Sequence, residues 1–143
     1  LKQGIPYLAE CGGFLYLQEF MEDMDGKEYP MVGIFSGKAY QTKKLGRFGY
    51  ITLTTQKENQ LLEKGTCIKA HEFHYFDCTD NGKDYHGVKP SGEKEWDCIR
   101  GGTHYAAGFP HLYYYSNLQF VQRFINQCKE YRRFENKIEK KKS

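Results

Sequence analysis

The chain has 143 residues, 39% of them hydrophobic and 27% charged, which is typical of a single globular domain. Aromatic residues make up 16% of the chain and argue against disorder, while a net charge of +3, owed largely to lysines at the end of the chain, does not indicate nucleic-acid binding. No apolar run approaches the roughly 20 residues that a membrane helix needs, so we predict neither a nucleic acid nor a membrane as a partner.

The first part of the chain predicts a strand, a tight turn and a helix. Residues 5–9 form a short apolar run, which is typical of a buried strand. The run ends at Cys11, Gly12 and Gly13. Apolar residues then recur at helical spacing, at Phe14, Leu17, Phe20 and Met21. We therefore expect a helix from about residue 13 to residue 23.

The middle of the chain predicts strands. Extended segments are expected at residues 31–35, 38–43, 47–55, 66–76, 96–100 and 105–109. Residues 36–37 are expected to form a turn, and residues 77–95 a hydrophilic loop or hairpin with Asn-Gly and Pro-Ser-Gly turn signals.

The last predicted element is a helix that begins after Ser116 or Asn117 as its N-cap. Its apolar residues fall on one face, at Leu118, Val121, Phe124, Ile125, Cys128 and Tyr131. We assign residues 1–136 to one domain and residues 137–143 to a basic tail. The mixture of strands and helices predicts an α/β fold.

Cys11 is the strongest candidate for a reactive residue. A strand, a cysteine, two glycines and a helix resemble a nucleophile elbow, in which the reactive side chain sits on a sharp turn. Gly12 and Gly13 are expected to let the backbone bend and the substrate approach. The N-terminus of the helix is expected to lower the thiol pKa. A buried structural cysteine beside a glycine turn is the alternative that this pattern leaves open.

Five segments, in order along the chain, resemble those of the cobyrinic acid a,c-diamide synthase family. They are Ala9-Glu10-Cys11-Gly12-Gly13 with Tyr16-Leu17, and residues 30–37, 44–50, 70–75 and 108–114. The resemblance covers residues 4–130 and implies the C-terminal, nucleophile-bearing portion of a class I-like glutamine amidotransferase domain. Its implied fold is flavodoxin-like, with a mixed sheet that is incomplete on its N-terminal side.

The resemblance also implies roles for individual residues. Cys11 corresponds to the nucleophile that attacks glutamine, and His111 to its general base. Gly12 corresponds to a donor of an oxyanion N–H group, with Gly13 beside it in the substrate site. Glu10, Glu72 and His74 are expected to lie behind these groups as supporting residues.

A second interpretation concerns the segment around His71. Cys67, His71, His74 and Cys78 are zinc-ligand residue types. On a strand, however, Cys67 and His71 point to the opposite face from His74 and Cys78. We therefore predict no metal site.

The sequence departs from the family in ways that affect the expected partners. Relatives with a full triad place a glutamate two residues after the catalytic histidine, where this chain has Tyr113. No phosphate-binding Gly-x-x-x-x-Gly-Lys-Ser/Thr loop occurs, so ATP and Mg²⁺ are expected in a separate synthetase domain and no cofactor in this chain. The chain begins at Leu1, and we expect a fragment that lacks the N-terminal half of its domain. An exposed sheet edge would then favour pairing with another chain or a second copy.

Two further expectations complete the prediction. The five cysteines are scattered and odd in number, which favours the reducing cytoplasm over an oxidising compartment. Two alternatives to a glutaminase remain open: another cysteine hydrolase with the same elbow, and a degenerate domain that only binds a partner.

Overall fold

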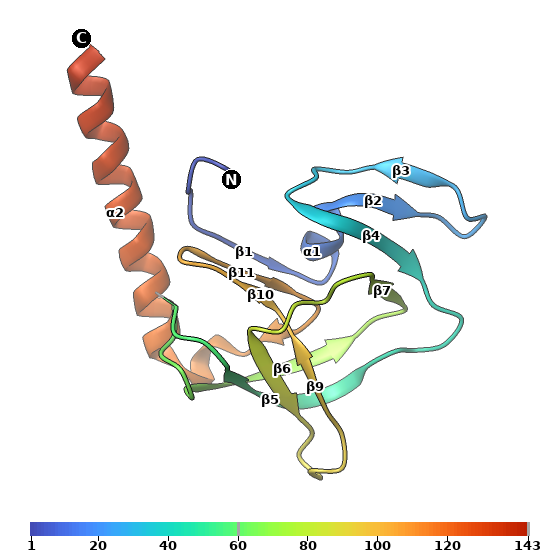
Figure 1. Ribbon diagram of the computed structural model, residues 1–143. Helices are drawn as coiled ribbons and strands as arrows, with labels where there is room; N and C mark the ends of the chain where they lie inside the picture. Colours follow the sequence, from blue (N-terminus) through green and yellow to red (C-terminus); the bar gives the residue numbers. More distant parts are fainter. Residues whose placement is uncertain (60, 143) are drawn as a thin grey trace.

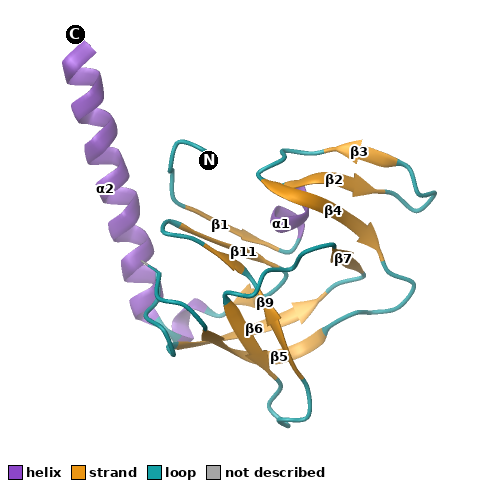
Figure 2. Cartoon of the chain, viewed as in Figure 1, coloured by secondary structure: helices purple, strands orange, loops and turns teal. Residues whose placement is uncertain are grey.

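The computed structural model describes residues 1–59 and 61–142, and the side chains as far as residue 137. Strands predominate in a mixed α/β arrangement with two α-helices among the described residues (Figures 1 and 2). The strands are β1 (Tyr7–Glu10), β2 (Gln18–Glu22), β3 (Glu28–Pro30), β4 (Phe35–Gln41), β5 (Phe48–Thr55), β6 (Cys67–Phe73), β7 (Phe76–Cys78), β8 (Tyr85–Val88), β9 (Glu95–Cys98), β10 (Arg100–Gly101), β11 (Tyr105–Gly108) and β12 (His111–Leu112). The helices are α1 (Gly12–Tyr16), the single-turn η1 (Tyr114–Ser116) and α2 (Leu118–Lys142).

The strands form three sheets. The first has the order β1-β11-β10, with β1 parallel to β11, and carries α1 at the end of β1 (Figure 1). The second, β12-β6-β5-β8-β9, is antiparallel throughout, and the third has the order β3-β2-β4-β7. Because β11 leads through Phe109 and Pro110 into β12, it joins the first sheet to the second beside the end of β1.

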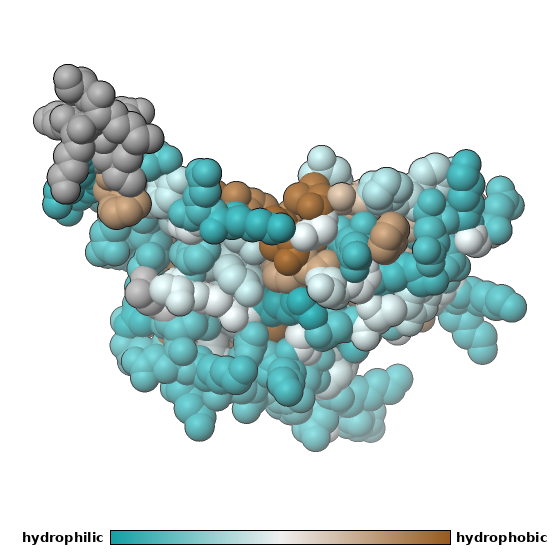
Figure 3. Space-filling view, turned by 45° about the horizontal axis from the view of Figure 1, so that its top comes forward, coloured by the Kyte–Doolittle hydropathy of each residue, from teal (hydrophilic) through white to brown (hydrophobic). Residues whose placement is uncertain are grey.

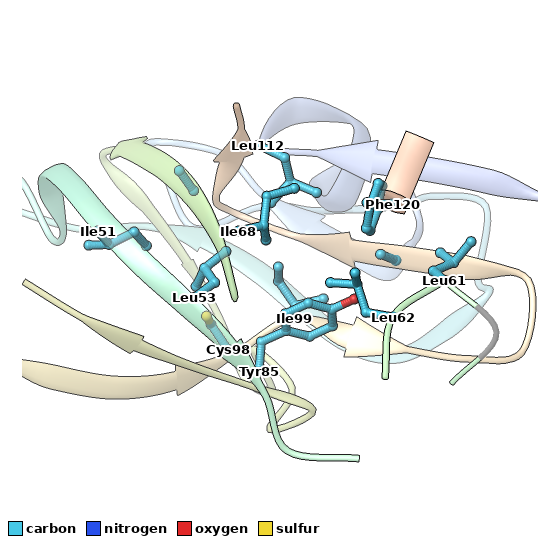
Figure 4. Packing of buried hydrophobic residues seen from close by; sticks show 12 residues of the cluster. Ile51, Leu53, Leu61, Leu62, Ile68, Tyr85, Cys98, Ile99, Leu112 and Phe120 are labelled. Atoms are coloured by element: carbon cyan, nitrogen blue, oxygen red, sulfur yellow. The ribbon is translucent and has the colours of Figure 1, made fainter. Parts of the chain in front are cut away.

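The larger hydrophobic core lies between the second sheet, the first sheet and the start of α2. The ring of Tyr85 occupies its centre, close to Leu62, Ile99 and Cys98 (Figure 4). Phe120 closes the core from α2 and is fully buried. Alternating burial along β5 and β6 follows from the period of two of a strand with one face on this core.

A smaller core supports the turn after β1. Phe14 of α1 is fully buried against Phe35 and Phe109, with ring centroids 5.9 and 5.6 Å apart. This cluster joins α1, β4 and the segment after β11, so the position of the turn depends on three parts of the chain.

The helix expected at residues 13–23 is wrong beyond its first turn. α1 ends at Tyr16, and the chain continues as β2, which pairs with β3 on one side and β4 on the other. The buried Gln18 side chain donates its amide N–H to the carbonyl oxygen of Phe14, which closes the short helix. The spacing of the apolar residues could not distinguish one long helix from a short helix followed by a strand, because both can bury the same residues.

The turn expected at residues 36–37 is also wrong, because both residues lie within β4. Gly37 has φ +135° and packs so closely on Thr79 that a Cβ atom there would lie 2.6 Å from the Thr79 Oγ1. The glycine therefore serves a close approach between segments rather than a turn. Residues 31–34 are irregular, so the strand expected at 31–35 begins only at Phe35.

Three other strand predictions are confirmed in outline, at β5, β6 and β11. The strand expected at 66–76 breaks after Phe73, and Phe76 opens β7. Of the loop or hairpin expected at residues 77–95, the hairpin is confirmed: β8 pairs with β9. β8 also pairs with β5, so it lies within the second sheet.

Helix α2 begins where expected, since the Asn117 side chain accepts the N–H of Phe120 at 3.1 Å. Its inner face differs from the predicted stripe: Phe120 is fully buried, whereas Leu118 is 64% exposed. The helix continues past residue 137, so the predicted basic tail begins within it, and most of that tail lies outside the described side chains. Among the described residues, none of the helices has the length and apolar character required to cross a membrane.

Candidate active site

The geometry of Cys11 is that of a strained turn between β1 and α1. The carbonyl oxygen of Gly108 in β11 accepts the N–H of Cys11 at 2.9 Å, and the carbonyl of Cys11 accepts the N–H of Leu15 at 3.0 Å. Between these bonds the Cys11 backbone has φ 48° and ψ −108°. A non-glycine residue rarely adopts this conformation, and such strain is concentrated at functional sites.

The sharp bend falls on the cysteine rather than on the glycines, contrary to the sequence-based expectation. Neither Gly12 nor Gly13 has a positive φ. A Cβ atom on Gly12 would face open space, and one on Gly13 would make an ordinary 3.7 Å contact with Ala9. Gly12 instead contributes its backbone N–H, which acts as a hydrogen-bond donor to the Cys11 sulfur.

The expectation that the helix lowers the Cys11 thiol pKa is wrong. Partial burial is the largest cause of a raised pKa, and the negative charges of Glu72 and Glu10 raise it further. The hydrogen bond from Gly12 lowers the pKa but does not prevail. A helix of five residues offers a weak dipole, so desolvation and two carboxylates outweigh it.

His111 lies beside the residue that precedes the cysteine. Its strand, β12, pairs with β6 so that His111 stands opposite His71. The His111 Nδ1 lies 3.7 Å from the Glu10 Oε2, an ion-pair distance that is longer than a direct hydrogen bond. The imidazole is 49% exposed, so a substrate can reach it from solvent. Glu10, which precedes Cys11 in the sequence, therefore lies beside His111, although His111 is distant from both in the sequence.

Glu72 and His74 form a buried pair on the inner side of this site. Glu72 Oε2 lies 3.1 Å from His74 Nε2, and the indole N–H of Trp96 donates to Glu72 Oε1 at 3.2 Å. The His74 ring stacks on Phe109 with centroids 3.9 Å apart. The pair thus supports the segment that leads from β11 to His111. The negative charge of Glu72 also raises the pKa of the Cys11 thiol.

The zinc-ligand residue types are not brought together. Cys67 is exposed at the start of β6, whereas Cys78 and His74 are buried. His71 lies on the outer face, where its ring meets the edges of Phe48 and Tyr50. Among the side chains that the structure describes, residues 1–59 and 61–137, no three of His, Cys, Asp or Glu converge as metal ligands would.

Two contacts of the site had no recognisable sequence signal. Tyr114 donates its hydroxyl to Glu10 Oε1 at 2.5 Å, although it lies in a run of three tyrosines that nothing distinguishes. Trp96 reaches Glu72 from the start of the strand expected at residues 96–100, and nothing in that segment indicated this contact. Both depend on pairings between distant strands, which hydrophobic pattern does not reveal.

A pocket of about 460 Å³ lies beside His111 on the outer face of the second sheet. It is lined by Tyr50, Lys69, Ala70, His71, His111, Leu112 and Tyr113. Neither Cys11 nor Glu10 is among these lining residues, so the pocket adjoins the histidine and not the cysteine.

Comparisons with known proteins identify the family of the chain. The family model of the CobB/CobQ-like glutamine amidotransferase domain matches residues 1–107, a range that includes Cys11 but ends before His111. The chain is 36% identical to the cobyrinate a,c-diamide synthase of Caldanaerobacter subterraneus over 135 residues, which is 93% of the chain and 30% of that relative.

Two other relatives carry the same description. The cobyrinate a,c-diamide synthase of Listeria innocua is 39% identical and that of Thermoplasma volcanium 35% identical, each over 135 residues. These matches cover 90% and 92% of the chain but 29% of each relative. The chain therefore spans less than a third of the length of these relatives. The family match and the identities together show that the chain belongs to the CobB/CobQ-like glutamine amidotransferase domain family.

Proposed function

We propose that the chain is the glutaminase part of an amidotransferase, with Cys11 as nucleophile and His111 as general base. The observation that carries the proposal is the strained backbone of Cys11 at the end of β1, with His111 brought to the adjacent Glu10. A cysteine held on such a turn presents its sulfur to a substrate, and a nearby imidazole can accept its proton.

The raised pKa of the thiol defines what His111 must do. At neutral pH the resting group is a thiol, so proton transfer to a base has to accompany attack. Glu10, whose Oε2 lies 3.7 Å from the Nδ1 of His111, is placed to stabilise the positive imidazolium that the transfer creates.

The proposed reaction has two stages. The Cys11 sulfur attacks the side-chain amide carbon of glutamine while its proton passes to His111, which then protonates the departing ammonia. His111 next takes a proton from water, which attacks the thioester carbon; the bond to the Cys11 sulfur then breaks, His111 returns the proton to that sulfur, and glutamate is released. The N–H of Gly12, with Gly13 beside it, is proposed to stabilise the oxyanion.

The larger context is proposed from the relatives. Their description as cobyrinate a,c-diamide synthases suggests that the ammonia serves ATP- and Mg²⁺-dependent amidation of corrinoid carboxylates by a synthetase domain. The proposed whole domain has flavodoxin-like layers, completed by an N-terminal half that continues the first sheet beyond β1. β1 is the edge strand of that sheet among the described residues. A second copy of the chain is the alternative partner for this edge.

The surface around β1 supports a covering partner. An apolar pocket of about 440 Å³ lies between β1 and α2, lined by Leu8, Tyr114, Tyr115, Leu118, Phe120, Val121 and Phe124. Hydrophobic residues also gather in the hollow beside α2 (Figure 3). Exposed apolar surface of this kind is typical of an interface.

All five cysteines are free thiols, consistent with the proposed cytoplasmic location.

The proposal is tested by labelling with a glutamine-like chloroketone, followed by intact mass and peptide mapping. We expect one adduct, on Cys11, which free glutamine blocks and His111→Ala slows strongly. Cys67→Ser is the matched control, because Cys67 is exposed and has an ordinary strand backbone, and it should leave the labelling unchanged.

Other results would redirect the assignment. Faster labelling by peptide electrophiles than by the glutamine analogue would favour another cysteine hydrolase of the same fold. Labelling of the exposed Cys67 and Cys128 as fast as that of Cys11 would favour a non-catalytic binding domain, a candidate that the raised thiol pKa of Cys11 also suits.

A further inference from the structure

The two oxygens of the Glu10 carboxylate have different partners. Oε1 accepts the backbone N–H of Leu112 at 3.3 Å and the hydroxyl of Tyr114 at 2.5 Å. Oε2 is left facing the Nδ1 of His111 at 3.7 Å. Two donors on one oxygen fix the plane of the carboxylate, so the other oxygen has a defined target.

The backbone on both sides of this contact is also fixed. Glu10 stands opposite Gly108 in the parallel pair β1–β11, and His111 stands opposite His71 in β12–β6. The Glu10 side chain is 25% exposed, so its charge is partly shielded from solvent. The carboxylate therefore lies at the junction of two sheets, next to the nucleophile in sequence and to the histidine in space.

The position two residues after the histidine offers no substitute. Tyr113 is 57% exposed, and its ring lies near that of Tyr115. The other titratable or charged groups around His111 are Tyr50, Lys69, His71 and Tyr113 of the adjacent pocket. Among the charged side chains described around His111, Glu10 is the only carboxylate.

We propose that Glu10 is the positioning residue of the active site and takes the place of the absent third triad member by holding His111 in the Nδ1–H tautomer. This inference rests on the proposed Cys–His glutaminase. With Nδ1 protonated and directed at Glu10, the Nε2 lone pair is the one available to take the proton of the Cys11 thiol. The carboxylate then stabilises the imidazolium after transfer.

The substitution Glu10→Gln separates this role from a structural one. Glutamine keeps the size of the side chain, and its carbonyl oxygen can still accept from Leu112 and Tyr114. Because those two donors require an acceptor, the NH₂ group must then face His111 Nδ1. Nδ1 becomes an acceptor, and the neutral ring is driven to the Nε2–H tautomer, which cannot take the thiol proton through Nε2.

The experiment uses the full chain with ¹⁵N-labelled histidine, with the signals of His111 assigned by His111→Asn. Long-range proton–nitrogen NMR at pH 8 should show Nδ1–H in the unaltered chain and Nε2–H in the Glu10→Gln chain. Alkylation of Cys11 by iodoacetamide should slow by roughly ten-fold or more, within the range of general-base effects. Tyr114→Phe is the matched control: it removes a donor to Oε1 but leaves Oε2 facing His111, so the tautomer should be unchanged.

Several outcomes would overturn the proposal. An Nε2–H tautomer of His111 in the unaltered chain would refute the role of Glu10, and this result does not depend on whether the Glu10→Gln chain folds. An unchanged tautomer in a folded Glu10→Gln chain would show that Glu10 is structural only. A reversed tautomer with unchanged alkylation would show that the ring orientation does not serve the thiol. Neither readout requires glutamine, so a chain that gives the expected results but hydrolyses no glutamine would refute the proposed function alone.

Discussion

The strained backbone of Cys11 should lower the free energy of unfolding of the chain. With φ 48° and ψ −108°, it lies in a region that disfavours any side chain with a Cβ atom. Such a residue costs about 1–3 kcal/mol, and glycine relieves that cost. Glycine also loses more conformational freedom on folding than alanine does, and this offsets about 0.5–1 kcal/mol of the relieved strain. We therefore expect Cys11→Gly to be more stable than Cys11→Ala by about 0.5–2 kcal/mol.

The comparison between the glycine and alanine variants of Cys11 isolates the backbone, because both lack the thiol. For a chain of this size the difference corresponds to about 2–6 °C in Tm. Urea unfolding, followed by the fluorescence of the single tryptophan, Trp96, gives the free energy directly. Neither variant should label with the glutamine analogue.

A matched pair at Cys67 tests the sign of the effect. Cys67 is exposed at the start of β6 and has an ordinary strand backbone, so glycine there should be less stable than alanine by about 0.5–1 kcal/mol. A Cys11→Ala chain as stable as the Cys11→Gly chain, with the expected loss at Cys67, would refute the argument that strain is stored at the nucleophile.

Three further predictions concern the support of the site. Phe14→Ala empties the small core under α1 and should lower the free energy of unfolding by about 3–5 kcal/mol, measured by urea titration; a loss below about 1 kcal/mol would contradict the packing described against Phe109. Asn117→Ala removes the N-cap of α2 and should cost about 1 kcal/mol with reduced helical circular dichroism, whereas Asn117→Asp should retain most of the stability. Burial raises the pKa values of Cys78 and Tyr85 to about 12 in the folded chain. The unfolded chain therefore loses these protons first, and stability should be complete below about pH 9 and fall as the pH rises towards 12; equal urea midpoints at pH 8 and pH 10.5 would contradict this linkage.

The parts of the site that the sequence predicted are those carried by contiguous residues. The strand before Cys11 and the helix after Asn117 are confirmed, because each combines an apolar pattern with a local end signal. The helix expected at residues 13–23 was cut short because strand pairing of β2 outweighed helical spacing. The pKa direction of the thiol was wrong for a related reason: a local dipole argument could not include the burial of Cys11, which is the largest cause of the raised pKa, or the charge of Glu72, which is distant in the sequence.

The sequence by itself determined the family resemblance, the α/β class and the identity of the nucleophile candidate, since these depend on local pattern and residue type. Only the tertiary structure decided where the bend falls at Cys11 and which carboxylate faces His111. Glu10 and His111 are brought together by the parallel pairing of β1 with β11 and by the turn into β12. Such non-local pairing is fixed by the packing of whole sheets, which no short segment of the chain encodes alone.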